Sequence, residues 1–387
     1  MHLSVAVASM LLVTTGTALA GSRSEPATGP TQVTRGDLAA LSTTKRIALT
    51  SCVVDFQTSA FVENDGSVLN RNTTRAVNKL VDAPRDVLQG VVDDACAKLR
   101  ADLKAAGYEL VPQSEIAAQP AYTKMLALTG IQGPVGHKSL DGGSLVFGSS
   151  DQPLYLPCGN ELAVYYQGAS PPDATWKQAI ADATDPPSAM ARSRTFDLPQ
   201  LEIDLAKALN AHVVKAWTVV RFSSVDAESR RDWTYQSESY DIAGNKTTMG
   251  ATDYKATSAA QLGVREYQTH LAVRVATGKP DFKPSFATGG KAPARDGDIV
   301  ITLVSPIFMN GSEQYLAVEN TGAKESGTGR VSRASGLLGG LMGSRGNTVT
   351  FSFSTRISDD AAYRKAAAFA VGEAQGRLVR AMTGTTP

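Results

Sequence analysis

The first half of the chain alternates between stretches with the period of a strand and stretches with the period of a helix. Residues 45–56 alternate and then run apolar, as a core strand does. A helix is predicted to begin at Pro84 and to stop at Gly107, a residue type that favours the left-handed stop position. The turn sequence Asn64-Asp65-Gly66 indicates a loop between this strand and this helix. The buried stripe of the helix recurs at helical spacing: Val87, Leu88, Val91, Val92, Ala95, Leu99 and Leu103.

The middle of the chain adds further elements on either side of an irregular segment. Residues 108–111 are predicted to form a short strand, and a helix begins at Ser114 and runs through residues 122–128 with an interruption at Pro120. Residues 129–159 are rich in Gly, Pro and Ser, which predicts an irregular excursion with one hairpin. Further predictions are a strand at residues 161–166 and a short helix at 176–181. Asp197 can cap a helix opened by Pro199, and the apolar run at 211–222 suits a strand covered on both faces.

The last third of the chain is richer in long strands. Residues 261–276, 298–309 and 348–357 each have the pattern of a strand. Ser358 is predicted to cap a final helix, with acidic residues in its first turn and Arg377 and Arg380 in its last, as the helix dipole favours. The pattern therefore predicts an α/β or α+β fold: a mixed sheet with packed helices, longer strands late in the chain and a C-terminal helix. We expect an α/β domain at residues 45–225 and a strand-rich part at 226–387, which can continue the same sheet.

The amino terminus has the pattern of a secretory signal peptide over residues 1–20. An apolar run over residues 3–13 is too short to span a bilayer, and Ala18-Leu19-Ala20 presents small residues to a signal peptidase, so cleavage is predicted after Ala20. The alternative is an uncleaved anchor. Residues 21–44 are small, polar and broken by Pro and Gly, which predicts a flexible leader. The expected location is periplasmic or secreted.

Charge and cysteine content narrow the range of partners. The chain holds 38 Lys plus Arg against 37 Asp plus Glu, so no large net field attracts nucleic acid, which we exclude as a partner. Peripheral contact with a membrane stays open. Cys52, Cys96 and Cys158 could form one disulfide in an exported compartment and leave one thiol, or all three could be buried free thiols; their spacing selects no pair.

Known catalytic and cofactor-binding patterns are not found in the sequence. It has no Gly-x-Ser-x-Gly elbow, no phosphate-binding Gly-x-x-x-x-Gly-Lys-Ser/Thr, and no His-Glu-x-x-His, and we expect no cofactor and no metal. His137, His212 and His270 are far apart, and His212 is interpreted as a satisfied core or helix-end residue. Two further groups are interpreted as surface. Asp93, Asp94 and Asp102 are read as a solvated helix face and not as paired catalytic carboxylates. Arg230, Arg231 and Trp233 are read as a surface group that flanks a turn, with a small basic and aromatic patch as the alternative.

One segment, residues 331–346, combines apolar side chains with five glycines in a surface connection. Two interpretations are open: a glycine-rich loop that folds back on its own core, or a contact surface that inserts into a partner subunit or a membrane interface. The flanking arginines favour an anionic or lipid-adjacent neighbour. The candidate interaction residues of this loop are Leu337, Leu338, Leu341, Met342, Arg333 and Arg345.

The order of the early elements resembles a known family. Three early features carry the resemblance: a strand that contains Arg46-Ile47-Ala48-Leu49 and Val54-Asp55-Phe56, the helix to Gly107, and Tyr108-Glu109-Leu110-Val111 leading into Ser114-Glu115-Ile116. In this order they are similar to the amino-terminal α/β unit of bacterial envelope proteins of the curli-secretion lipoprotein family. The resemblance covers residues 45–128 and extends at most to 222. This chain lacks the lipidated Cys of that family. The resemblance implies an oligomeric assembly or secretion accessory without catalytic residues.

These observations lead to three function hypotheses. The first is an exported, non-catalytic cell-envelope protein that acts by association with itself or with an envelope protein. The second is a secreted hydrolase whose site is assembled from distant residues. The third is a periplasmic small-ligand binding protein with a pocket lined by Trp217, Trp233 or Tyr235.

Overall fold

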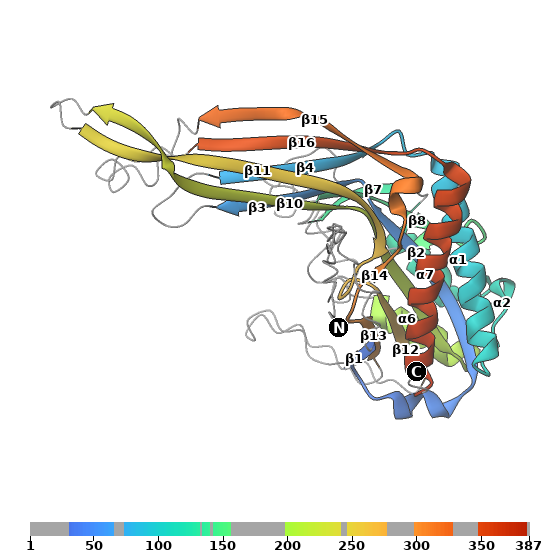
Figure 1. Ribbon diagram of the computed structural model, residues 1–387. Coiled ribbons are helices and arrows are strands. Elements are labelled where there is room, and N and C mark those ends of the chain that lie inside the picture. Colours follow the sequence, from blue (N-terminus) through green and yellow to red (C-terminus); the bar gives the residue numbers. More distant parts are fainter. Residues whose placement is uncertain are drawn as a thin grey trace, which may run out of the picture.

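The larger of two main sheets organises the body of the protein in a computed structural model of the chain (Figure 1). The structure describes residues 31–65, 73–131, 134–139, 142–155, 198–240, 246–276, 298–327 and 347–384. We call the larger sheet sheet A. In spatial order its strands are β1 (Thr31–Arg35), β13 (Asp298–Leu303), β12 (His270–Arg274), β10 (His212–Tyr240), β2 (Arg46–Gln57), β8 (Gly142–Gly148) and β7 (Val135–Ser139).

Sheet A is mixed, and shorter strands extend it. Strand β2 pairs parallel with β10 and with β5 (Glu109–Leu110) and antiparallel with β8. Strand β11 (Lys246–Val264) pairs antiparallel with β10 and with β14 (Ile307–Phe308). The smaller sheet, sheet B, has the order β15 (Leu316–Gly327), β16 (Asn347–Ile357), β4 (Thr73–Val81) and β3 (Ser59–Asp65). A separate pair joins β6 (Gly130–Ile131) to β9 (Leu154–Tyr155).

Helices cover both faces of sheet A. The long helices α1 (Arg85–Ala105) and α7 (Asp360–Met382) share one apolar core with the sheet, and α2 (Gln113–Ala117), α3 (Pro120–Thr129) and α6 (Leu198–Leu209) share a second. Ile47 contributes to the first core and Ala48 to the second, because successive side chains of a strand point to opposite faces. The remaining helical turns are η1 (Leu38–Thr43) and η4 (Ser312–Gln314). The predicted fold class is confirmed.

The two long helices pack closely against each other through glycine. A Cβ atom added at Gly372 of α7 would lie 2.6 Å from the Lys98 side chain of α1. Arg364 of α7 donates to both carboxylate oxygens of Asp94 on α1, at 2.8 and 3.0 Å. Helix α7 is capped by the Asp359 side chain, which accepts from the Ala362 amide, and not by Ser358 as predicted. None of the helices in the described part of the chain is both long and apolar enough to cross a membrane.

A disulfide joins the central strand to the helix that covers it. Cys52 of β2 and Cys96 of α1 are bonded across a sequence separation of 44, and both are buried. The sequence left the pairing open, and the alternative of three buried free thiols is wrong for these two residues. Cys158 lies outside the described residues.

The structure differs from the sequence predictions in several connections. Among the described residues, β1 and η1 lie within the segment expected to be a flexible leader. The predicted loop around Asn64 contains the antiparallel strands β3 and β4. The strand expected at residues 261–276 is broken into β11 and β12, and the one at 298–309 into β13 and β14. Residue 225, the expected domain boundary, lies inside β10; of the later strands, β11 to β14 belong to sheet A and β15 and β16 to sheet B.

Candidate functional site

The most distinctive feature is a long hairpin that leaves the body. Strand β10 has 29 residues, but its pairing with β2 ends at Val220↔Phe56. Beyond that point it pairs with β11 as far as Tyr240↔Lys246. A typical strand in a globular protein has about five or six residues. The hairpin therefore extends well past the sheet that it helps to build, away from helices α1 and α7 (Figure 1).

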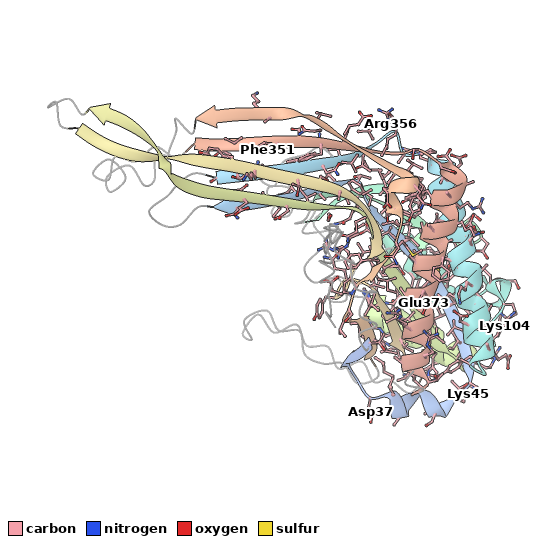
Figure 2. All side chains as sticks on the ribbon, in the orientation of Figure 1. Asp37, Lys45, Lys104, Phe351, Arg356 and Glu373 are labelled. Carbon is pink, nitrogen blue, oxygen red and sulfur yellow. A yellow bond between two sulfur atoms is a disulfide. The ribbon has the colours of Figure 1, made fainter. Side chains whose placement is uncertain are left out.

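Sheet B forms a second layer on this hairpin, and we call the two layers together the arm. The arm consists of β3, β4, β15, β16 and residues 223–240 and 246–261 of β10 and β11. Ala76, Ala227 and Phe353 form its small buried cluster, with Phe351 and Val62 among the partly buried residues around them. Figure 2 shows Phe351 in the arm, while Glu373 lies on the body. An isolated two-stranded hairpin is marginally stable in water, so layering stabilises the arm.

A buried polar cluster fixes how the two layers of the arm align. The Asn78 side chain on β4 donates to the Ser258 hydroxyl on β11 at 2.7 Å and to the Thr355 hydroxyl on β16 at 2.8 Å. Asn78 and Thr355 are fully buried. Buried polar groups are costly unless they are hydrogen-bonded, so any shift between the layers that separates these groups is disfavoured.

The outer face of sheet B, which points away from the hairpin, carries alternate residues of its strands. On β3 the Asn64 side chain donates to the Ala227 carbonyl of the hairpin, so Phe61 and Glu63 point outward. Phe61 is 41% exposed, and Arg75 of β4 lies over its ring, 5.9 Å from the centroid. Arg75 also forms an ion pair with Glu63 at 2.7 Å. This face combines one exposed aromatic ring with charged and hydroxyl side chains.

The loop that the sequence singled out joins two strands of the arm. Its candidate residues Leu337, Leu338, Leu341, Met342, Arg333 and Arg345 lie outside the described residues. Strand β15 ends at Gly327 and β16 begins at Asn347, so the loop at residues 331–346 connects adjacent strands of sheet B. That this loop is a contact surface remains a prediction.

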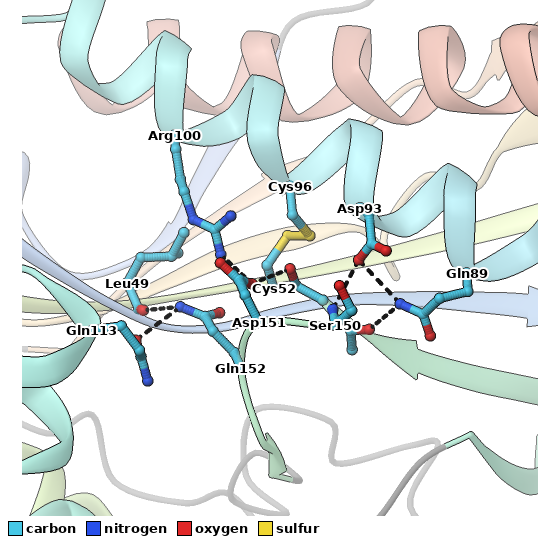
Figure 3. A network of polar contacts seen from close by, with 12 residues as sticks. Leu49, Cys52, Gln89, Asp93, Cys96, Arg100, Gln113, Ser150, Asp151 and Gln152 are labelled. Atoms are coloured by element: carbon cyan, nitrogen blue, oxygen red, sulfur yellow. Dashed lines mark hydrogen bonds and ion pairs between the residues drawn. A yellow bond between two sulfur atoms is a disulfide. The ribbon is translucent and has the colours of Figure 1, made fainter.

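A polar network fastens the segment after β8 to α1 and β2 (Figure 3). The Asp93 carboxylate accepts from the Gln89 side chain at 3.1 Å and from the Ser150 amide at 2.8 Å. Asp151 accepts from Arg100 at 2.8 Å and from the Ser149 hydroxyl. Partial burial alone would raise the pKa of the Asp151 carboxyl, but the hydrogen bonds from Ser149 and Arg100 outweigh it, and the pKa is lowered.

The same network extends to the edge of β2, and it has the chemistry of an anchor. The Gln152 side chain donates to the Leu49 carbonyl at 2.8 Å and to the Gln113 side chain at 3.1 Å. A serine beside a carboxylate is not activated as a nucleophile when that carboxylate is held by an arginine, because the arginine keeps the carboxylate a weak base. Each of the predicted surface carboxylates has a partner: Asp93 accepts from the Ser150 amide, Asp94 from Arg364, and Asp102 pairs with Lys98 at 2.7 Å.

A buried cluster of charges lies under α6. Glu202 of α6 accepts from Lys215 of β10 and from Arg274 of β12, each at 2.6 Å, and all three side chains are at most 5% exposed. Sequence reasoning missed this cluster because its members come from three separate elements. The sequence did contain a signal for this cluster: Lys215 lies within an otherwise apolar strand, and Glu202 lies within the apolar helix before it. Charged groups at apolar positions are buried only when they are paired.

His212, His270 and Trp217 lie in the core. His212 is fully buried, and its Nε2 lies 3.3 Å from the Leu41 carbonyl, as the core interpretation predicted. Burial lowers the pKa of its imidazole. Trp217 is buried in an apolar cluster with Val53, Val146, Leu154 and Val219. Within the described ranges no three His, Cys, Asp or Glu side chains are grouped as metal ligands.

The group predicted to flank a turn, which includes Arg230 and Arg231, lies in the hairpin itself. Arg230 and Arg231 of β10 pair with Asp253 and Thr252 of β11, so they belong to the middle of two strands and do not flank a turn as predicted. Sequence reasoning missed most of the arm, since its strands alternate small and polar residues with few large apolar ones. Alternation over residues 254–260 was the available signal.

Comparison with known proteins adds no assignment, since no family model, no curated protein and no solved structure matches this chain.

Proposed function

We propose that this protein is an exported cell-envelope protein that acts by association, as an assembly or secretion accessory, and not by catalysis. The observation that carries the proposal is the arm. The hairpin of β10 and β11 continues for most of its length beyond its last pair with β2, and its neighbour in the arm is sheet B. Long strands with free edges are templates for pairing with another chain, so proteins seldom retain them without a use.

The disulfide supports export. Disulfides persist in oxidising compartments such as the periplasm or the extracellular space and are rare in the cytosol. The bond between Cys52 and Cys96 lies in the main core and ties the central strand to α1. A core that includes a disulfide fits the signal peptide proposed for residues 1–20, which lie outside the described part of the chain.

The order of elements is compatible with the proposed relationship to the curli-secretion lipoprotein family. Strand β2, helix α1, strand β5 and helix α2 follow one another as that resemblance implies, with the β3–β4 hairpin inserted between β2 and α1. The resemblance supports the same class of role, an oligomeric accessory of envelope assembly or secretion.

The test is the native mass of the chain from Gly21 onward, measured by light scattering over a wide concentration range. In one variant, Asn-Gly replaces residues 229–254 and closes the hairpin directly after the Glu228↔Lys255 pair. A second variant lacks residues 331–346. The retained arm cluster and the disulfide should keep both variants folded, which circular dichroism and thiol titration can check.

The expected result is a defined oligomer whose mass falls when the hairpin is shortened. A smaller number of chains per oligomer in the variant that lacks residues 331–346 would assign part of the contact to that loop. A monomer at every concentration in all three proteins would overturn the proposal of self-association.

A further inference from the structure

We propose that the outer face of sheet B is the interface between two copies of this chain. The inference rests on the proposed function, because it names the partner and the surface for association. The hairpin covers the inner face of sheet B, and the residues that argue for the interface lie on the opposite face.

One row of this face decreases steadily in size from one edge to the other. Phe61 of β3 is opposite Val77 of β4, which is opposite Ser352 of β16, which is opposite Gly322 of β15. Phe61 is exposed at one end of the row. A Cβ atom added at Gly322 would meet nothing within 4 Å, so the other end is a shallow, open position. The row therefore has a projection at β3 and a depression at β15.

The adjacent row is charged in opposite senses at its two ends. Glu63 of β3 is opposite Arg75, which is opposite Thr350, which is opposite Lys324 of β15. Glu63 and Lys324 are both exposed. An acidic group thus lies at the β3 edge and a basic group at the β15 edge, on the same side of the sheet.

This arrangement is complementary to itself under one two-fold rotation. An axis parallel to the strands, passing between β4 and β16, places β3 of each copy over β15 of the other. Phe61 then lies over Gly322 of the partner subunit, and Lys324 lies over Glu63 of the partner subunit. A two-fold dimer needs a patch that fits itself in this way, with each contact made twice.

The size of the face suits a weak, reversible dimer. Four strands about 4.8 Å apart and nine residues long, at about 3.3 Å per residue, cover roughly 600 Å² on each copy. Stable interfaces bury about 800 Å² per partner, so this face lies toward the lower end of the range. The mixture of one aromatic anchor with charged and hydroxyl groups also agrees with an interface that forms reversibly.

Site-specific cross-linking tests the geometry. Glu63→Cys and Lys324→Cys are made separately on a Cys158→Ala background, and the two proteins are mixed with a short bismaleimide. Packed sheets are about 10 Å apart, whereas the two edges of one sheet are about 14 Å apart. The mixture is expected to give a covalent dimer, and each variant alone is expected to give little. Equal cross-linking of either variant with itself would overturn the proposed axis.

Native mass tests the energetics on the full chain. Phe61→Lys is expected to weaken the dimer at least tenfold, because it replaces the aromatic anchor with a charge beside Arg75. Phe369→Lys on α7 is the matched control, since Phe369 is 60% exposed on the body, and it should leave the mass unchanged. Glu63→Lys and Lys324→Glu should each weaken the dimer, and the double variant should recover part of the loss.

The outcomes separate this inference from the proposed function. If shortening the hairpin dissociates an oligomer but Phe61→Lys does not, the outer-face interface is wrong and association through the hairpin stands. If Phe61→Lys and Phe369→Lys weaken association equally, the interface is also wrong. A wild-type chain that is monomeric at all concentrations overturns this interface and the proposal of self-association.

Discussion

Removal of the disulfide is the perturbation whose size the structure defines best. Replacing both Cys52 and Cys96 by alanine removes a cross-link between two residues that are 44 positions apart in the sequence. In the chain-entropy model this increases the entropy of the unfolded state by about 13 cal/mol/K, or about 4 kcal/mol at 25 °C. The two buried sulfur atoms also lose packing, which adds to the cost. The double variant should therefore lose at least about 4 kcal/mol of unfolding free energy.

Urea unfolding followed by circular dichroism measures this loss. With a slope of about 3 kcal/mol per molar urea, a loss of 4 kcal/mol lowers the midpoint by roughly 1.3 M. The wild type unfolded in reducing buffer keeps both sulfur atoms, so its difference from the double variant isolates the packing contribution. Cys158→Ala is the control and should leave the midpoint close to that of the wild type.

Two results would refute this reasoning. If Cys158→Ala lowers the midpoint as much as the double variant does, the native pairing differs from the bond between Cys52 and Cys96. If the double variant unfolds at the wild-type midpoint, the cross-link does not restrict the unfolded chain, and the entropic account fails.

Three further predictions concern the body of the protein. Glu202→Gln removes the carboxylate that two buried cations share and should cost about 3–5 kcal/mol in urea unfolding, whereas Glu373→Gln, at a half-exposed ion pair, should cost less than about 1 kcal/mol. Burial lowers the pKa of His212, so the imidazole binds a proton more readily in the unfolded chain than in the folded protein. The unfolding free energy should therefore be at its full value above about pH 6.5 and should fall as the pH drops toward the lower folded-state pKa. His212→Gln should flatten the dependence of the urea midpoint on pH in that window. Gly263→Ala would place a Cβ atom 2.4 Å from a backbone carbonyl of β14 and should lower the unfolding free energy by about 1–3 kcal/mol, while Gly90→Ala, which meets only a flexible arginine, should be nearly neutral; equal effects would contradict the backbone clash.

The sequence predicted the elements of the body where periodicity was strong. Every residue of the predicted stripe of α1 is buried, together with Gly90 and Cys96, and Gly107 after the end of the helix is left-handed as predicted. The strand at 211–222 is buried on both faces, as its apolar run indicated. These elements follow from local pattern, because each buries its apolar side chains at a spacing that only one type of secondary structure provides.

The sequence did not predict the arm. Residues 223–240 and 246–260 continue as strands, although the described side chains that they place against sheet B include small or polar ones such as Ala227 and Ser258. Such residues have weak strand signals when they are taken alone. They become strands because two layers meet, and the layers bury Asn78 and Thr355 together in a way that no local pattern encodes.

The sequence by itself determined the class of the fold, the helices with a regular apolar stripe, and the expectation of export. Only the tertiary structure decided which cysteines pair, which carboxylate holds the buried cations, and that β3 and β15 become the edges of one outer face. The physical reason is distance along the chain. Hydrophobic periodicity acts within about one helix or strand, whereas the pairs that define the core charges and the arm join residues tens to hundreds of positions apart, such as Asn78 and Thr355.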